Sequence, residues 1–300
     1  MRLTTFRNNA ASEAGLYRVG ALWNDDSAIL DFFKAFALEE VDSYSLLPWF
    51  NLDGNLLPRA LEFYARCLEN PAEAEKFLIA QKEIELSAPV PRPGKLICIG
   101  LNYRDHAIES NMEIPKIPIV FSKYPTSVVG DNQPVILPNG SKQADYEAEL
   151  AVIIGRYAKN ISPENALDYV LGYANLNDVS ERGFQFADGQ WQRGKSCDTF
   201  APIGKFIATK DEIVDPHNLN IAFRLNNETL QQSNTNQLIF DIPAIVSFLS
   251  ETVTLEPGDV IATGTPPGVG FARKPPVYLK SGDIMEVEIE GLGILRNPVG

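Results

Sequence analysis

Histidine and cysteine are scarce in this chain of 300 residues. There are two histidines, His106 and His217, and three cysteines, Cys67, Cys98 and Cys197. Zinc sites are usually built from closely spaced Cys and His ligands, and no two of these cysteines form a CxxC pair. A disulfide-stabilised scaffold needs more cysteines than this. The composition therefore argues against both, and it predicts that the three cysteines are buried, reduced thiols.

The chain also has few basic residues and no long apolar run. Lys and Arg number 26 against 39 Asp and Glu, which gives a formal net charge of −13. Binding to nucleic acid or anionic lipid needs clustered positive charge, and no Lys/Arg-rich run supplies it. No apolar stretch approaches the roughly 18 residues of a membrane span, and the start, MRLTTFRNNAASEAG, does not read as a secretion signal. We therefore expect a cytoplasmic protein with no nucleic-acid or membrane partner.

Composition and proline placement predict two parts. The chain is 45% hydrophobic and 22% charged, as a globular protein is. The segment PVPRP, within residues 87–94, holds three prolines in five residues, which favours a boundary because proline fixes φ and removes a donor. We predict a small N-terminal α/β domain over residues 1–90 and a catalytic domain over 91–300. In the first part, LTTF and LYRVGALW read as strands, and residues 27–40 and 57–84 as helices.

The second part is predicted to be mostly strands. Gly, Pro, Asn and Asp turns separate the segments KLICIG, IVFSK, PVILP, YEAELAVIIG, IGKFIAT, LNIAFRLNN, DVIATGT, IMEVEIEGLG and ILRNPV. Helices are expected only at ENALDYVLG and at residues 241–252. Strands and long helices do not alternate, which argues against a doubly wound sheet or an eightfold barrel. The pattern favours an α+β fold, mainly β, with a sandwich-like or barrel-like core.

The segment DYEAELAVIIG carries two acids at alternate positions. In a strand, Glu147 and Glu149 share a face with Ala151 and Ile153. Two buried carboxylates repel each other unless a cation or a proton lies between them, and a divalent ion is the natural solution. An edge strand with a wet face at its start would also explain the pair. The opposite face takes Tyr146, Ala148, Leu150, Val152 and Ile154.

A third acid, Asp178, follows a strand-like run in GYANLNDVSERGFQ. By itself an Asp there is typical of a helix N-cap or a turn. Together with Glu147 and Glu149 it would complete a site of three carboxylates, which leaves coordination positions open for water and substrate. Oxygen ligands of this kind suit Mg²⁺, Mn²⁺ or Ca²⁺.

A histidine and a glutamate stand three residues apart in GLNYRDHAIES. One helical turn would bring His106 next to Glu109, which would fix the ring tautomer and raise the basicity of the other nitrogen. A surface histidine on a short helix is the alternative. His217, in the Pro/Asn turn VDPHNLN, is predicted at the surface.

Two further segments carry polar residues without a clear period. Lys195 lies in QWQRGKSCDTFAPIG, where a solvated loop lysine is the simple explanation. The segment ATGTPPGVG, residues 262–270, is not a phosphate loop because no GK[ST] closes it. It offers Thr265 and backbone N–H groups to an anion.

Taken together, the separated motifs resemble the fumarylacetoacetate hydrolase family. They are GLNYRDHAIE, DYEAELAVIIG, NDVSERGFQ, GKSCDTFAPIG, LNNETLQQSNTNQLIF and GDVIATGTPPGVG, in that order over about residues 90–300. The resemblance implies a mixed β roll around a Mg²⁺ or Mn²⁺ site, which Ca²⁺ can fill structurally, in a homodimer. It departs where the usual S-A-R-D reads S-E-R-G at residues 180–183, and where Lys205 replaces the usual proline.

The resemblance also implies roles for particular residues. The metal ligands are Glu147, Glu149 and Asp178. The catalytic residues are His106, Glu109 and Lys195. The substrate contacts are Arg182, Gln185 and Thr265.

These residues fit three hypotheses about function. The first is a divalent-metal-dependent hydrolase that cleaves a C–C bond in a small 2-oxo, 1,3-diketo acid of the acylpyruvate type, as in aromatic catabolism. His106 and Glu109 would activate water, and the metal and Lys195 would stabilise the expelled enolate. The second keeps the site but decarboxylates oxaloacetate or acts as a keto–enol isomerase of the hydroxymuconate type. The third is a non-catalytic binding protein, with residues 1–90 as its interaction module.

Overall fold

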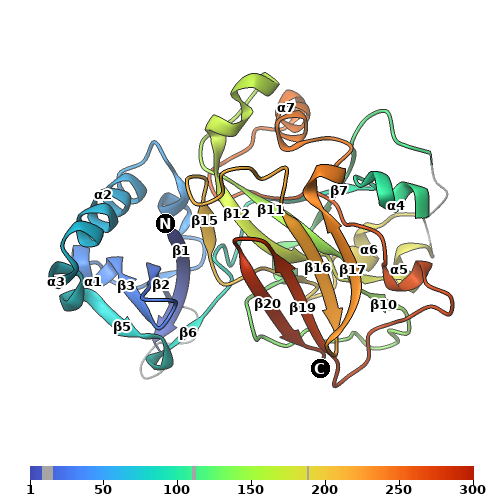
Figure 1. Cartoon of the computed structure of the whole chain (residues 1–300), viewed down its shortest axis with the longest axis horizontal. Coiled ribbons are helices and arrows are strands. Elements are labelled where there is room, and N and C mark those ends of the chain that lie inside the picture. Colours follow the sequence, from blue (N-terminus) through green and yellow to red (C-terminus); the bar gives the residue numbers. More distant parts are fainter. Residues whose placement is uncertain (9–15, 110–112, 188) are drawn as a thin grey trace.

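The computed structural model describes residues 1–8, 16–109, 113–187 and 189–300, and strands dominate it (Figure 1). The strands are β1 (Arg2–Asn8), β2 (Leu16–Trp23), β3 (Ala28–Asp31), β4 (Val41–Asp42), β5 (Leu78–Ala80), β6 (Ile84–Leu86), β7 (Leu96–Gly100), β8 (Ile119–Lys123), β9 (Val128–Val129), β10 (Ala144–Asp145), β11 (Ala148–Ile154), β12 (Val170–Asn177), β13 (Ser180–Glu181), β14 (Ala201–Pro202), β15 (Ile207–Thr209), β16 (Asn220–Leu225), β17 (Glu228–Asn234), β18 (Val260–Ala262), β19 (Ile284–Ile289) and β20 (Gly293–Pro298).

The helices are short. The α-helices are α1 (Phe32–Phe36), α2 (Leu56–Glu69), α3 (Pro71–Ala74), α4 (Arg104–Glu109), α5 (Arg182–Gln185), α6 (Gln192–Lys195) and α7 (Ile242–Thr252). The 3₁₀ helices are η1 (Leu47–Phe50), η2 (Glu75–Phe77), η3 (Gln81–Glu83), η4 (Pro125–Ser127), η5 (Pro163–Tyr169), η6 (Thr235–Gln237) and η7 (Gly270–Ala272).

One large sheet runs through both parts of the chain. Within the described ranges its strand order is β5-β3-β2-β1-β15-β12-β11-β18-β7-β8, with β4 on β2 and β6 on β1. The join is made by β1, which pairs antiparallel with β15. A second sheet has the order β17-β16-β19-β20 (Figure 1). The α+β, mainly β prediction is confirmed, and the large sheet is open rather than closed into a barrel.

Strand β11 lies at the centre of the core. Its residues Leu150 and Val152 belong to one hydrophobic cluster. Ala151 and Ile153 belong to a second cluster, which extends into the N-terminal part and includes Trp49. Every residue of β11 is buried. The predicted alternation of faces is therefore confirmed, and the edge-strand alternative is wrong.

The two helices predicted in the N-terminal part are shorter than expected. Residues 27–40 begin with β3, which pairs with β2 and β5, and only then form α1, where the buried Asp31 accepts hydrogen bonds from two backbone amides. Residues 57–84 do not form one continuous helix: α2 ends at Glu69, and short helical turns follow in α3, η2 and η3. Pro71 follows, and a proline ring prevents continuation of the preceding helix. The chain then returns to the sheet as β5 and β6.

Two further predictions need correction. The segment PVILP is not a strand; only Val135 makes an isolated bridge, with Val299. The segment ENALDYVLG is not an α-helix, because η5 ends at Tyr169 and β12 begins at Val170. Here the β-branched and apolar end of the segment pairs with β11 in the sheet, which overrides its helical pattern.

The three cysteines form no disulfide with one another. The predicted burial is confirmed for Cys67 and Cys98 and is wrong for Cys197, which is half-buried. Burial raises the pKa of Cys98 well above its usual value, so this thiol is unreactive. Within the described part of the chain, no helix has the length and apolar character needed to span a membrane.

Candidate active site

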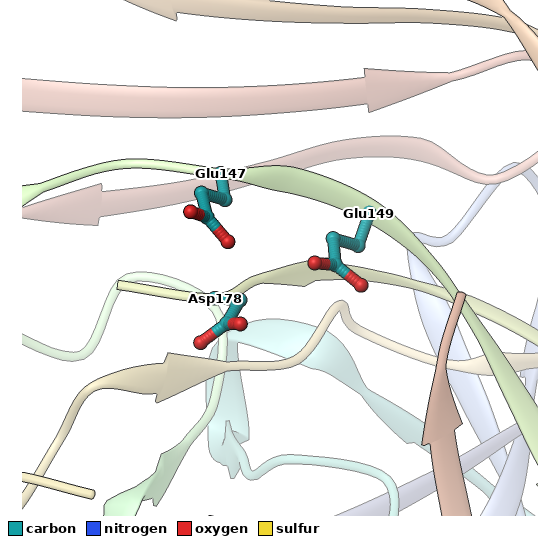
Figure 2. Close-up of side chains that lie close together, drawn as sticks. All are labelled: Glu147, Glu149 and Asp178. Carbon is teal, nitrogen blue, oxygen red and sulfur yellow. The ribbon is translucent and has the colours of Figure 1, made fainter. Parts of the chain in front are cut away.

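Three carboxylates meet where β11 and β12 run side by side. Glu147 directly precedes β11, Glu149 lies in it, and Asp178 directly follows β12. The antiparallel pairing of these strands brings the backbone N–H of Asp178 to within 2.8 Å of the Glu147 carbonyl oxygen. One oxygen from each carboxylate lies within 4.8 Å of the others, and all three residues are buried (Figure 2). The predicted triad is thus assembled by sheet register.

The carboxylate of Glu149 forms no ion pair with a lysine or arginine among the described residues. Its hydrogen-bond partner is the backbone N–H of Gly264, at 2.7 Å, and the residue is 1% exposed. Burial and the nearby carboxylates of Asp178 and Glu147 raise the pKa of Glu149 well above its usual value. A divalent cation would relieve this repulsion, and an all-oxygen donor set suits Mg²⁺ or Mn²⁺. The residues present therefore fit such an ion.

Lys195 crosses between two of the carboxylates. Its Nζ donates to Glu147 Oε2 and Asp178 Oδ2, both at 2.7 Å, and the residue is 2% exposed. Burial disfavours the charged amine, but Asp178 and Glu147 outweigh it and raise the pKa of Lys195. Gly194 sets its position, because a Cβ there would lie 2.5 Å from the Gln185 nitrogen of α5. The solvated-loop alternative for Lys195 is wrong.

Arg182 holds the other side of Glu147. Its Nη2 donates to Glu147 Oε1 at 2.5 Å, its Nε to Asp145 Oδ2 at 2.9 Å, and its Nη1 to Gln185 Oε1 at 2.9 Å. Burial raises the pKa of Glu147, but Lys195 and Arg182 outweigh burial and lower it to about 2. Lys195 and Arg182 therefore favour the ionised form of Glu147, whereas burial and the neighbouring carboxylates disfavour the ionised form of Glu149.

Two residues of this network were missed from the sequence. Lys123, at the end of β8, donates from Nζ to Asp178 Oδ1 at 2.6 Å and to the Val179 carbonyl oxygen at 2.9 Å. Asp145 pairs with Arg182. The available signals were a lysine that ends the apolar run IVFSK and an acid that opens DYEAE. Neither signal points to a partner, because the partners lie far away in sequence.

The histidine and glutamate lie together on α4. His106 is 7% exposed, so the surface alternative is wrong. Its Nδ1 lies 3.4 Å from Glu109 Oε2, in a geometry that makes no hydrogen bond. Glu109 accepts a hydrogen bond from the backbone N–H of Gly268 at 3.0 Å. The other histidine, His217, is half-buried, and its Nε2 accepts from the Ile242 N–H at 3.3 Å.

The backbone N–H groups of the segment 262–270 do contact anionic groups, as predicted, but these are carboxylate side chains of the protein itself. The backbone N–H groups of Gly264, Gly268 and Gly270 donate to Glu149, Glu109 and Asp145, respectively. This turn therefore connects the carboxylate triad with α4 and the Arg182 pair. The hydroxyl oxygen of Thr265 accepts from Gln231 Nε2 at 2.9 Å, which leaves its O–H free to donate.

A cavity of about 180 Å³ opens onto these groups. Seven of the nine residues predicted to form the site line it, and Glu109 and Asp178 contact those residues from behind. The polar residues of its lining are His106, Glu147, Glu149, Arg182, Gln185, Lys195 and Thr265. The apolar residues of its lining include Ile99, Leu101, Ile119, Phe121, Phe186, Trp191 and Phe271.

Comparison with known proteins identifies related sequences. Residues 95–300 match the family model described as "Fumarylacetoacetate (FAA) hydrolase C-terminal". The chain is 48% identical over 229 residues to "Oxaloacetate tautomerase fahd2, mitochondrial" of Xenopus laevis, over 76% of this chain and 72% of the relative. It is 50% identical over 223 residues to "Oxaloacetate tautomerase Fahd2a, mitochondrial" of Rattus norvegicus, over 74% and 71%.

Solved structures with this fold carry several activity names. The fumarylacetoacetate hydrolase from Exiguobacterium antarcticum superposes with a TM-score of 0.79 at 34% identity, over 100% of this chain and 99% of the other. The 5-carboxymethyl-2-hydroxymuconate delta-isomerase from Mycobacterium smegmatis does so with a TM-score of 0.77 at 30% identity, over 100% and 99%. Solved structures with this fold are thus named both as hydrolases and as isomerases.

Proposed function

This chain is an enzyme of the fumarylacetoacetate hydrolase family, and we propose that it interconverts the keto and enol forms of oxaloacetate. The observation that carries the proposal is its identity of 48% and 50% to two relatives that both bear the name oxaloacetate tautomerase. Hydrolysis of a C–C bond in an acylpyruvate, favoured from sequence, has weaker support, because two solved structures named as hydrolases are 34% and 30% identical.

The triad is proposed to hold one divalent ion, Mg²⁺ or Mn²⁺. Glu147, Glu149 and Asp178 would each offer an oxygen ligand. Bound there, the ion would stabilise the negative charge that develops on the 2-oxo group during enolisation. The relative placement of the three carboxylates is fixed by the β11–β12 pairing and by the contacts of Glu147 and Asp178 with Lys195.

The proton is proposed to move through His106. Tautomerisation breaks a C–H bond at C3 and forms an O–H bond at the C2 oxygen, so no atom is gained or lost. Because Nδ1 faces Glu109, Nε2 is the nitrogen that would take the C3 proton and deliver it to the C2 oxygen, and the reverse reaction would return it to C3. A positioned base of this kind is worth roughly 10²–10⁴ in rate.

The remaining polar residues would orient the substrate. Arg182 and Gln185 are joined by a hydrogen bond and present donors to the cavity, where substrate carboxylates would lie. The free O–H of Thr265 would add a third donor. The apolar lining residues, including Phe271, would limit access of water, so that a developing enolate is protonated by the protein rather than by solvent.

The proposal is tested with purified protein, Mg²⁺ or Mn²⁺, and oxaloacetate. Ultraviolet absorbance follows the enol, and a coupled assay detects pyruvate. We expect fast keto–enol equilibration without pyruvate, and a loss of about 10²–10⁴ in rate for His106→Ala. His217→Ala is the matched control and should leave the rate unchanged. Release of pyruvate and CO₂ would instead identify a decarboxylase, and cleavage of an acylpyruvate a hydrolase.

Compartment, assembly and domain boundaries stay predictions. The relatives above carry the word mitochondrial in their names, so they give no support for the cytoplasmic location predicted from sequence. We retain the homodimer, a role in aromatic catabolism, and the division into residues 1–90 and 91–300 as proposals. Gel filtration with light scattering measures the mass in solution and so tests the homodimer directly.

A further inference from the structure

Glu181 is a buried carboxylate that the proposed mechanism does not use. It is 1% exposed. Ser141 Oγ donates to it at 2.5 Å, and the backbone N–H groups of Gln143 and Gly183 each donate to it at 3.1 Å. Within the described ranges no lysine or arginine forms an ion pair with it. Hydrogen-bond donors of a loop and of a helix start, rather than a cation, therefore satisfy this charge.

These bonds fix the place of Arg182 in the site. Strands β10 and β13 pair with Ala144 opposite Glu181, and the Arg182 N–H donates to the Gln143 carbonyl oxygen at 3.0 Å. Arg182 is the next residue along the chain, and its guanidinium holds Glu147. A shift of the loop at residues 139–143 relative to α5 would therefore move the group that orients a proposed metal ligand.

Gly183 has no side chain and so leaves space for the Glu181 carboxylate. A Cβ at position 183 would lie 2.9 Å from Glu181 Oε1 and 3.4 Å from Gln143 Oε1. The Cβ of any other residue at 183 would therefore crowd the Glu181 carboxylate, which would have to shift. Conversely, when residue 181 is small, an Asp at 183 would place its own carboxylate among the same donors. These two positions are the ones at which S-E-R-G differs from S-A-R-D.

We propose that Glu181 is a positioning residue, which acts through Arg182 on Glu147. Positions 181 and 183 act as one unit, because the buried carboxylate that accepts from the loop can be supplied by a residue at either position. The effect on turnover rests on the proposed function, whereas the effect on metal binding does not. Because residues outside the ligand set commonly tune metal affinity by 10- to 100-fold, the unit should be visible in the affinity for Mn²⁺.

The test is a double-mutant cycle with Glu181→Ala, Gly183→Asp and the double variant. Electron paramagnetic resonance of free Mn²⁺ gives the dissociation constant, and oxaloacetate kinetics give kcat and KM. We expect each single variant to weaken Mn²⁺ binding and lower kcat/KM by roughly tenfold or more. The double variant should recover to within about threefold of the wild type, because the two sites are in contact and non-additive.

Asp31→Ala is the matched control. Asp31 is also a fully buried carboxylate that caps a helix start, but it lies in the N-terminal part. Its loss should lower stability and leave Mn²⁺ affinity unchanged. The proposal is overturned if Glu181→Ala keeps wild-type Mn²⁺ affinity, or if the double variant shows the product of the two single losses.

A fallback variant and the separate Mn²⁺ measurement distinguish failure to fold, failure of the proposed function and failure of the role proposed for Glu181. If Glu181→Ala does not fold, Glu181→Gln replaces it. The Gln amide keeps one acceptor oxygen but turns N–H groups toward the donors of the loop. Mn²⁺ binding should therefore weaken by roughly two- to fivefold. Unchanged binding in that variant contradicts the proposal. If the wild type does not tautomerise oxaloacetate, the proposed function fails, while the Mn²⁺ cycle still decides the role of Glu181.

Discussion

At the residue scale, the two glutamates of DYEAE differ in their surroundings. Glu147 lies between Lys195 and Arg182, which keep it ionised. Glu149 accepts one backbone hydrogen bond and lies close to two other carboxylates. Opposite charges therefore stabilise one carboxylate, and only a proton or an added cation can stabilise the other. This difference makes Glu149 the residue on which binding of a metal should depend most.

Substitution of Glu149 by Gln tests this dependence through stability. Gln is neutral and can still accept from the Gly264 N–H, so the metal-free variant should be at least as stable as the wild type. Mn²⁺ at 100 times its dissociation constant should stabilise the wild type by about 2.7 kcal/mol, and this gain should be lost in the variant. Melting temperatures with Mn²⁺ and with EDTA measure it.

Glu62→Gln is the control, because Glu62 is an exposed acid on α2. It should show the full Mn²⁺-dependent rise in melting temperature. An equal rise in Glu149→Gln would mean that the ion does not use this carboxylate.

At the element scale, the turn at residues 262–270 connects parts that the sheet leaves separate. Its amides hold Glu149 in β11, Glu109 in α4 and Asp145 in β10. Gly268 adopts φ +98°, and a Cβ on it would lie 2.0 Å from the Leu230 carbonyl oxygen. The turn can therefore approach β17 only with glycine at this position.

Gly268→Ala should reduce both stability and activity. Gly282 provides the comparison, because it has a similar φ of +92° but open space around it. We expect Gly282→Ala to cost about 1–2 kcal/mol through φ alone, with activity unchanged. Gly268→Ala should cost more, and lower kcat by about tenfold or more because Glu109 loses its anchor. Urea unfolding and oxaloacetate kinetics measure the two effects.

Equal losses of stability in the two variants would show that the backbone relaxes around the added methyl group. Unchanged kcat in Gly268→Ala would show that the Glu109 contact does not matter for catalysis.

At the scale of the whole molecule, the N-terminal part and the site share one sheet and one core. Strand β1 pairs with β15, and Thr4 Oγ1 donates to the Lys205 carbonyl oxygen at 2.7 Å. Lys205 replaces the proline of the usual motif, and its Nζ lies 3.7 Å from Asp131 Oδ2. Ala151 and Ile153 of β11 pack in the same cluster as residues of the N-terminal part.

Because of this shared core, the chain should unfold in one transition. In Trp191→Phe, tryptophan fluorescence reports Trp23 and Trp49 of the N-terminal part, while circular dichroism reports the whole sheet. The urea midpoints of the two signals should coincide. Phe33→Leu, in the N-terminal core, should lower both midpoints together, because it should reduce the free energy of unfolding of the whole chain by about 1 kcal/mol. A fluorescence transition at lower urea than the dichroism transition would instead support independent domains.

The local predictions succeeded where short spacing decides the structure. Alternation places Glu147 and Glu149 on one face, and a three-residue spacing puts His106 beside Glu109 on α4. They failed in part at residues 27–40 and 57–84, where the strands β3 and β5 pair in the sheet instead of continuing the predicted helices. In those segments the partner strand, rather than local propensity, decided the conformation.

The sequence alone determined the family, the mainly β fold class and the charged and amide residues that line the cavity, because these follow from local pattern and motif order. Only the tertiary structure decided how the charges are balanced. Lys123 meets Asp178 across 55 residues of chain, and Thr4 meets Lys205 across 201. Such pairings depend on strand order and register, which no local spacing encodes. They decide that Glu147 pairs with Arg182 and Lys195, whereas Glu149 forms no ion pair among the described residues and accepts from the Gly264 N–H.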